Sequence, residues 1–226
     1  MGCVLGCSRM RAWTDLSHPL DPRAPRIAIF PAPSFATVAE MPADPMTVSQ
    51  MDMVVHTGTH VDAPCHFVAG AESIDEIDLS RLTGEGVVCR VEAGEDEVYG
   101  LDALVDRELV REGDIVVLET GWWCHVGTPL YARHPSLSVD LARWLVDRRV
   151  SMIAVDTGTP DVPVQLRPEG FNWPVHQILL GAGVLIAEHV TNLTALSGQR
   201  VELMFAPLNI RGSDGAPVRA VGRPVS

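Results

Sequence analysis

The chain has 226 residues, of which 46% are hydrophobic and 20% charged, and its formal net charge at pH 7 is −12. This composition is typical of a globular protein with a substantial core, and the length suits one large domain. The negative charge and the lack of a basic run disfavour nucleic acid and anionic membranes as partners, because phosphate binding needs clustered lysine and arginine.

The two ends of the chain and its cysteines narrow the class of protein further. Residues 1–10 lack the pattern of a secretory signal, and we interpret them as a disordered leader or a misassigned start. The longest apolar stretch, 178–187, is shorter than the roughly 20 residues that span a bilayer. The cysteines are odd in number and scattered, which fits neither a disulfide framework nor paired zinc ligands. We therefore expect a cytoplasmic protein with one domain over residues 11–226.

The first half of the chain is predicted to be mostly extended. Residues 13–45 are rich in proline, which blocks helices, and should contain strand fragments such as 27–30. Strands are predicted at 48–55, 87–91 and 115–118, the last of these buried because it is a continuous β-branched run. Helical apolar spacing predicts a helix over 101–111.

The second half alternates between predicted strands and helices. Ser138 is a suitable N-cap for a helix through Arg149, and a strand is predicted at 150–155. A short helix over 176–180 should end at Gly181, and a strand at 184–187 should lead into Glu188. Residues 201–210 are expected to lie centrally in the sheet and 217–221 at its edge. The prediction is a single α/β domain with a mixed β-sheet.

Residues 56–67, with the sequence HTGTHVDAPCHF, hold the densest group of reactive side chains. Chance would place about 0.4 histidines in such an eleven-residue window, and His56, His60 and His66 all fall within it. Imidazole and carboxylate are the ligands of zinc and manganese. Gly58 permits a tight turn that brings His56 back towards His60, and Asp62 lies on the same face of a strand as His60. These three residues are therefore predicted to bind metal.

Three further residues are less clear from the sequence alone. Pro64 turns the chain, so that His66 stays near the cluster as a ligand, a general base or a hydrogen-bonded core residue. His176 begins a predicted helix, and Glu188 follows an apolar strand, where a carboxylate is costly to bury unless it is paired or bound to metal. For His176 and Glu188, structural and functional roles are equally compatible with the sequence.

Residues 56–67 match the signature His-x-Gly-Thr-His-x-Asp-x-Pro-x-His-Phe, so the chain resembles the cyclase family of metal-dependent hydrolases. This family includes bacterial kynurenine formamidase and isatin hydrolase. The resemblance continues through 15–20, 30–31, 156–157, 176–193 and 212–221, and thus covers nearly the whole chain. It implies a swivelling β/β/α fold, assembly into a homodimer or homotetramer, and a small-molecule substrate.

The resemblance also assigns roles to individual residues. It implies one ion on His56, His60, Asp62 and Glu188, and a second ion on Asp62, His176 and Glu188. His66 becomes the catalytic acid or base. The expected cofactor is one or two divalent ions, zinc first and manganese as the alternative.

Three aromatic residues, Phe30, Trp122 and Trp173, are predicted to contact the substrate. Phe30 stands where formamidases carry a tryptophan. Core packing is the alternative role for each of the two tryptophans.

The implied reaction is hydrolysis of the C–N amide bond of a small aromatic or cyclic amide. Arylformamidase activity, from N-formylkynurenine to kynurenine and formate, is the first choice, and ring opening of a cyclic amide such as isatin is the second. A metal-dependent binding protein without turnover is a third possibility. Serine-type catalysis is disfavoured because the chain has no Gly-x-Ser-x-Gly elbow.

Overall fold

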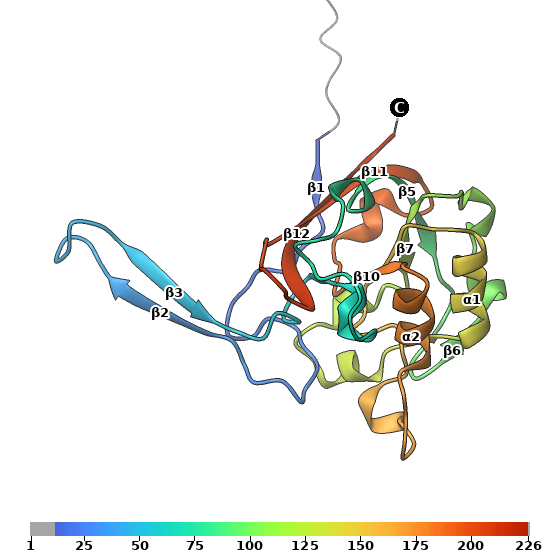
Figure 1. Ribbon diagram of the computed structural model, residues 1–226, viewed down its shortest axis with the longest axis horizontal. Coiled ribbons are helices and arrows are strands. Elements are labelled where there is room, and N and C mark those ends of the chain that lie inside the picture. Colours follow the sequence, from blue (N-terminus) through green and yellow to red (C-terminus); the bar gives the residue numbers. More distant parts are fainter. Residues whose placement is uncertain (1–11, 226) are drawn as a thin grey trace, which may run out of the picture.

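An 8-stranded mixed sheet forms the centre of the protein in a computed structural model that describes residues 12–225 (Figure 1). The predicted leader, residues 1–10, lies outside the described residues. Strand order in the sheet is β1 (Thr14–Asp15), β12 (Gly215–Pro224), β11 (Arg200–Pro207), β5 (Thr83–Arg90), β7 (Ile115–Glu119), β9 (Met152–Val155), β10 (Leu185–Glu188) and β4 (His60–Asp62). Because β4 also pairs with β12, the sheet closes into a barrel-like arrangement. The predicted α/β fold with a mixed sheet is confirmed.

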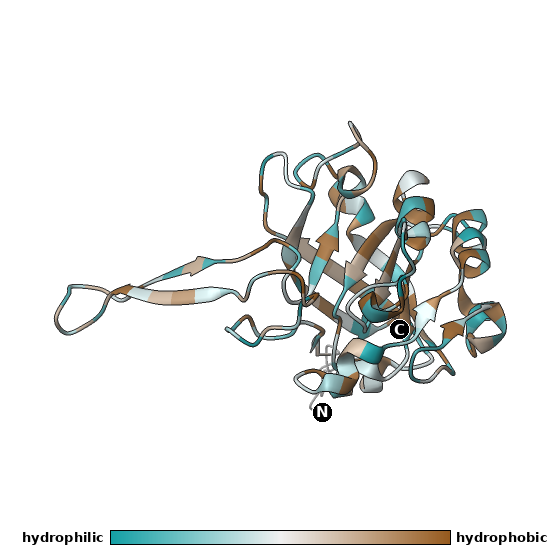
Figure 2. Ribbon diagram, turned by 90° about the horizontal axis from the view of Figure 1, so that it is seen from below, coloured by the Kyte–Doolittle hydropathy of each residue, from teal (hydrophilic) through white to brown (hydrophobic). Residues whose placement is uncertain are grey.

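The central strands are buried on both faces, which explains why their sequences are continuously apolar. In β7, Ile115 and Val117 belong to the core inside the curved sheet, whereas Val116 and Leu118 belong to the core between the sheet and the helices. The helices α1 (Val139–Asp147) and α2 (Pro174–Gly181) pack side by side over this second core. Figure 2 shows the hydrophobic strands in the middle of the body. The sheet therefore has an inner face and a helix-covered face.

Short elements complete the chain. A small parallel sheet joins β6 (Val98–Tyr99) to β8 (Ser136–Leu137). Single 3-10 turns occur at Pro64–His66, Leu79–Arg81, Leu101–Ala103, Arg107–Leu109, Trp122–His125, Pro129–Arg133, Val164–Leu166 and Leu193–Leu196. No helix among residues 12–225 is long and apolar enough to cross a membrane.

Most predicted elements are present, but three predictions are wrong. Residues 101–111 form two separate 3-10 turns because the fully buried Leu104 between them is extended and bridges to Val91. Residues 27–30 form a turn closed by a hydrogen bond from the Phe30 amide to the Ile27 carbonyl, not a strand. The strand predicted at the edge is β12, which pairs with β1, β11 and β4. The helix after Ser138 is confirmed, and the Ser138 hydroxyl accepts a hydrogen bond from the Leu141 amide.

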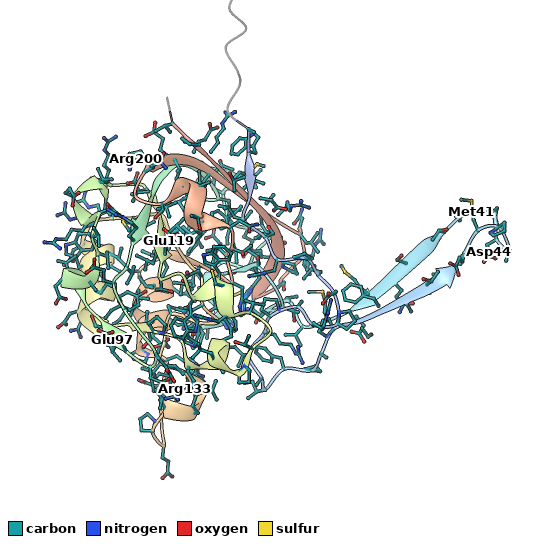
Figure 3. The ribbon with its side chains drawn as sticks, turned by 180° about the vertical axis from the view of Figure 1, so that it is seen from behind. Met41, Asp44, Glu97, Glu119, Arg133 and Arg200 are labelled. Carbon is teal, nitrogen blue, oxygen red and sulfur yellow. The ribbon has the colours of Figure 1, made fainter. Side chains whose placement is uncertain are left out.

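A hairpin of β2 (Ser34–Ala39) and β3 (Val48–Asp52) projects far from the body (Figure 1). Met41 and Asp44 lie at its tip (Figure 3). Nearly every hairpin side chain is exposed, including the apolar ones of Phe35, Val38, Met41, Met46, Val48 and Met51. A two-stranded hairpin is marginally stable on its own in water, so this segment lacks the packing that stabilises the rest of the fold.

Candidate metal centre

Strand geometry places three predicted ligands, His60, Asp62 and Glu188, on the helix-covered face of the sheet. Val61 and Ala187 belong to the inner core, so the side chains on either side of them in sequence point the other way. Antiparallel pairing of β4 with β10 sets Glu188 directly opposite His60. The Nε2 atom of His60 lies 3.3 Å from Asp62 Oδ1 and 3.4 Å from Glu188 Oε2. The expectation that His60 and Asp62 share a face is confirmed.

His56 joins this group through a tight turn at Gly58. The φ angle of Gly58 is +68°, in the left-handed region that favours glycine. The turn brings His56 Nδ1 to 2.8 Å from Asp62 Oδ1. His60 Nδ1 lies 2.8 Å from the Gly58 carbonyl oxygen, which can only accept, so this nitrogen carries the proton. The lone pair of His60 Nε2 is therefore directed at the two carboxylates.

The helix α2 brings the last predicted ligand to the opposite side of Asp62. Pro174 is the first residue of the helix, where its missing N–H costs nothing. Two residues later, His176 Nε2 lies 3.5 Å from Asp62 Oδ2 and 3.3 Å from Glu188 Oε1. Asp161 accepts hydrogen bonds from His176 Nδ1, at 2.6 Å, and from the amides of Val175 and His176. A carboxylate on the far nitrogen of a histidine is the usual support of a metal ligand.

The electrostatics of this buried group favour positive charge. Burial opposes protonation of His56, but hydrogen bonds to Asp214 and Asp62 outweigh it and raise its pKa to about 10. Burial likewise opposes protonation of His176, yet its hydrogen bond to Asp161 and those to Asp62 and Glu188 raise its pKa. Burial alone would raise the pKa of Asp62, but its histidine neighbours hold it well below the usual range. Carboxylates that stabilise buried imidazolium also stabilise a divalent cation.

A second observation, which does not depend on charge, also indicates that these ligand atoms suit a divalent metal. His60 Nε2 is buried and has no hydrogen-bond partner, which is costly unless a cation accepts its lone pair. The ligand atoms of His56, His60 and Asp62 all lie within 4.8 Å of one another, and so do those of Asp62, His176 and Glu188. These two groups share Asp62. The first matches the ligands that the resemblance implies for one ion, without Glu188, and the second matches those implied for the second ion. The number of ions stays a prediction.

His66 lies beside the metal group and is held by an acidic residue that the sequence analysis did not single out. The Pro64–His66 turn stacks the His66 ring on His56, with centroids 4.1 Å apart. Asp214, just before β12, accepts from His66 Nδ1 at 3.0 Å and from His56 Nε2 at 2.9 Å through the same oxygen. Burial lowers the pKa of His66. Its neutral ring therefore carries a proton on Nδ1 and a free lone pair on Nε2.

A cavity of about 150 Å³ opens onto this group of side chains. His56, Asp62, His66, His176 and Glu188 form its polar wall. The remaining lining residues are Ile27, Ile29, Phe30, Phe67, Thr159, Arg167 and Trp173. The structure thus brings Phe30 and Trp173 to the cavity, as the sequence predicted.

Trp122, the third predicted substrate contact, does not line this cavity. Its ring is buried against His125, and its indole N–H donates to the Tyr131 carbonyl. The alternative role, core packing, applies to this tryptophan, because its backbone amide is also held by the buried carboxylate of Asp156.

Three residues of the site were missed by sequence reasoning, namely Asp161, Arg167 and Asp214. Asp161 and Asp214 lie 15 and 148 positions from the histidines that they support, so no local spacing reveals them. Arg167 follows a proline-rich loop, and only the cavity shows where this loop folds. For Asp214, the available signal was a lone acid shortly before the predicted strand 217–221, which is too common to single out a residue.

Comparisons with known proteins agree with this geometry. The Cyclase family model, described as "Putative cyclase", matches residues 14–162. Kynurenine formamidase from Polaromonas naphthalenivorans is 28% identical over 229 residues, covering 96% of this chain and 92% of the relative. A structure described as a predicted metal-dependent hydrolase from Bacillus stearothermophilus has 28% identity and a TM-score of 0.76, covering 93% of this chain and 97% of that one.

Isatin hydrolase A from Labrenzia aggregata has the same fold, with a TM-score of 0.85 over 95% of this chain and 94% of that one, at 23% identity. The family match extends from the opening strand through the His56–Phe67 signature to Asp161, and thus includes β4 and the carboxylate that supports α2. The chain therefore belongs to the Cyclase family.

Proposed function

We propose that the chain is a metal-dependent amidohydrolase that cleaves the C–N bond of a small aryl formamide, with N-formylkynurenine as the first choice. The observation that carries this proposal is the buried convergence of imidazole and carboxylate ligands beside a cavity that also holds His66. Relatives of nearly the same length that are named kynurenine formamidase support the choice of substrate.

The metal would be held by His56, His60, Asp62, His176 and Glu188. Zinc is the first choice because it combines with nitrogen and carboxylate ligands in hydrolytic sites, and manganese is the alternative. When bound, a divalent cation supplies a Lewis acid that polarises a carbonyl and lowers the pKa of water.

His66 is suited to move the protons of the reaction. Asp214 Oδ2 accepts a hydrogen bond from His66 Nδ1 at 3.0 Å and so keeps the ring proton on Nδ1. The other nitrogen, Nε2, can then accept a proton from the water that adds to the amide carbon. The C–N bond then breaks, and the same proton passes to the departing nitrogen. The products are an amine and a carboxylic acid, which accounts for every atom of the amide and the water.

The aromatic walls of the cavity suit a flat substrate. Phe30 stacks towards His56, with ring centroids 6.3 Å apart, and Trp173 lies near Phe67, with ring centroids 6.1 Å apart. Stacking adds about 0.5–1.5 kcal/mol beyond the burial of apolar area. Phe30 lacks the indole N–H that the resemblance implies for formamidases, and this difference supports a cyclic amide such as isatin as the second candidate.

We further propose that the protein assembles as a homodimer or homotetramer. The hairpin of β2 and β3 supports this, because it exposes the apolar side chains of Phe35, Val38, Met41, Met46, Val48 and Met51, which a second copy would bury. Phe35→Glu with Val38→Glu, both on β2, should shift the mass measured by light scattering towards 24.5 kDa. A wild-type protein that is already monomeric at micromolar concentration would contradict assembly.

The free state of Cys65, Cys89 and Cys124 supports a cytoplasmic location.

Metal removal tests the proposed function directly. Protein freed of metal by chelation, and verified by elemental analysis, should not hydrolyse N-formylkynurenine, and added zinc or manganese should restore the rate. Full activity of the verified metal-free protein would overturn the proposal. Hydrolysis of isatin without hydrolysis of N-formylkynurenine would favour the second candidate.

A further inference from the structure

Arg167 is the cationic side chain of the cavity that neither the metal group nor the proton-transfer pair uses. Its guanidinium lies over two aromatic rings, with Cζ 5.4 Å from the centroid of Trp173 and 5.2 Å from that of Phe171. Its Nε–H donates to the Val162 carbonyl at 3.0 Å. The guanidinium is therefore held in place at the cavity by contacts that leave its two terminal NH₂ groups free.

Among the described residues, no carboxylate pairs directly with this guanidinium, and Asp161 and Glu188 attract it only at longer range. Among residues 12–225, no carboxylate forms an ion pair or a hydrogen bond with Arg167. Arg81, Arg90 and Arg200 each contact at least one carboxylate. Arg26, Arg107 and Arg148 contact only carbonyl oxygens or a ring, but they do not line this cavity. An arginine fork with free terminal donors matches a carboxylate in shape and charge. An unpaired arginine at a cavity in a chain of net charge −12 is thus a ready binding group for an anion.

A series of aromatic contacts connects the metal group to Arg167. From the ligand His176, the contacts pass to Phe67 at 4.6 Å and from Phe67 to Trp173 at 6.1 Å, measured between ring centroids. Arg167 in turn contacts Trp173. Arg167 and the metal group thus line the same cavity without contacting each other, so a substrate bound by both carries its anion on a different part of the molecule from its amide carbonyl.

We propose that Arg167 binds the carboxylate of an anionic amide substrate, and so selects an aryl formamide that bears a carboxylate on a substituent separate from the amide. This inference rests on the proposed hydrolase function and narrows its substrate class. N-formylkynurenine has this arrangement, because its amino-acid carboxylate and its formamide lie on different substituents of the ring. A neutral cyclic amide such as isatin has no carboxylate for Arg167 to bind.

The test compares a charged with a neutral aryl formamide, namely N-formylkynurenine and formanilide. Arg167→Met should raise KM for N-formylkynurenine about 10- to 100-fold, the range for loss of a charged hydrogen-bonded pair. Its kcat should change little, and kcat/KM for formanilide should stay within about twofold of the wild type. Arg167→Lys should recover part of the loss through its charge.

Arg148→Met is the matched control, because Arg148 also lies over a tryptophan, 5.0 Å from the Trp144 ring, but caps the C-terminal end of α1 and does not line the cavity. This variant should leave kcat and KM for both formamides unchanged. Equal losses on both formamides in Arg167→Met would overturn the inference, since they would show a structural role. An unchanged KM for N-formylkynurenine would overturn it as well.

Calorimetric titration with kynurenine, which keeps the carboxylate, separates this inference from the proposed function. If the metal-loaded wild type hydrolyses neither formamide, the proposed function fails. Kynurenine binding that is lost in Arg167→Met would then still support the role of Arg167, and binding that is equal in both proteins would overturn it.

Discussion

Gly215 in β12 provides a sharp test of the metal centre, because it touches a predicted ligand without being one. A Cβ atom added at Gly215 would lie 2.9 Å from His56 Cε1, 3.4 Å from His56 Nδ1 and 2.8 Å from the Val61 carbonyl oxygen. Non-bonded carbon atoms pack at about 3.5–4.0 Å, so Gly215→Ala must displace the His56 ring by roughly 0.6–1 Å. Overpacking of this kind costs about 1–3 kcal/mol of the free energy of unfolding.

The expected result is a loss of metal affinity of about 10- to 100-fold, the range for disturbing the support of a ligand. Competition with a chromophoric chelator measures the affinity, and thermal unfolding of the metal-free protein measures stability separately. Gly181→Ala is the control, because a Cβ there, at the end of α2, meets nothing within 4 Å and the backbone needs no positive φ. Metal affinity equal to the wild type in a folded Gly215→Ala protein would show that His56 is not a ligand.

Three further predictions follow from the same region and from one buried histidine outside it. His66→Ala should lose turnover and keep its metal, whereas His60→Ala should lose the metal; equally poor metal binding by both variants, measured by elemental analysis, would make His66 a ligand. Asp214→Asn keeps the shape of the carboxylate but removes its charge, and should lower kcat and metal affinity each by about 10- to 100-fold. A change confined to KM would contradict the support of His56 and His66. His134 is buried, which lowers its pKa from 6.5 to about 4, so the unfolded chain binds its proton first as the pH falls. The contribution of neutral His134 to the free energy of unfolding is therefore complete above pH 6.5 and should fall by about 3 kcal/mol towards pH 4. In urea unfolding at pH 7 and pH 4, His134→Gln should lose less stability between the two pH values than the wild type does. An identical pH dependence in wild type and variant would show that His134 titrates normally.

The parts of the site that sequence reasoning predicted are those that local geometry determines. His56, His60, Asp62 and His66 lie within eleven residues, and the turn at Gly58 together with strand alternation is enough to bring them together. Asp214 could not be predicted, because its contact with His66 depends on the pairing of β12 with β4 across most of the chain.

The errors in the fold have a similar physical origin. The apolar spacing of residues 101–111 is that of a helix, but burial of Leu104 and its bridge to Val91 outweigh local propensity. Proline lacks an amide donor and is usually confined to edges, which would fit the predicted edge position of residues 217–221, yet Pro217 is accommodated where β12 meets the short strand β4.

The position of β12 in the sheet also has a consequence for biosynthesis. The strand β4 carries His60 and Asp62, and it is bordered by β10 on one side and by residues 215–217 of β12 on the other. A nascent chain emerging from the ribosome therefore holds its first two ligands long before either neighbour of β4 exists. Contacts this distant in sequence form slowly, because a long loop must close before they stabilise the chain. During translation, histidines 56 and 60 should remain accessible to chaperones and stray metal ions until the final strand is made.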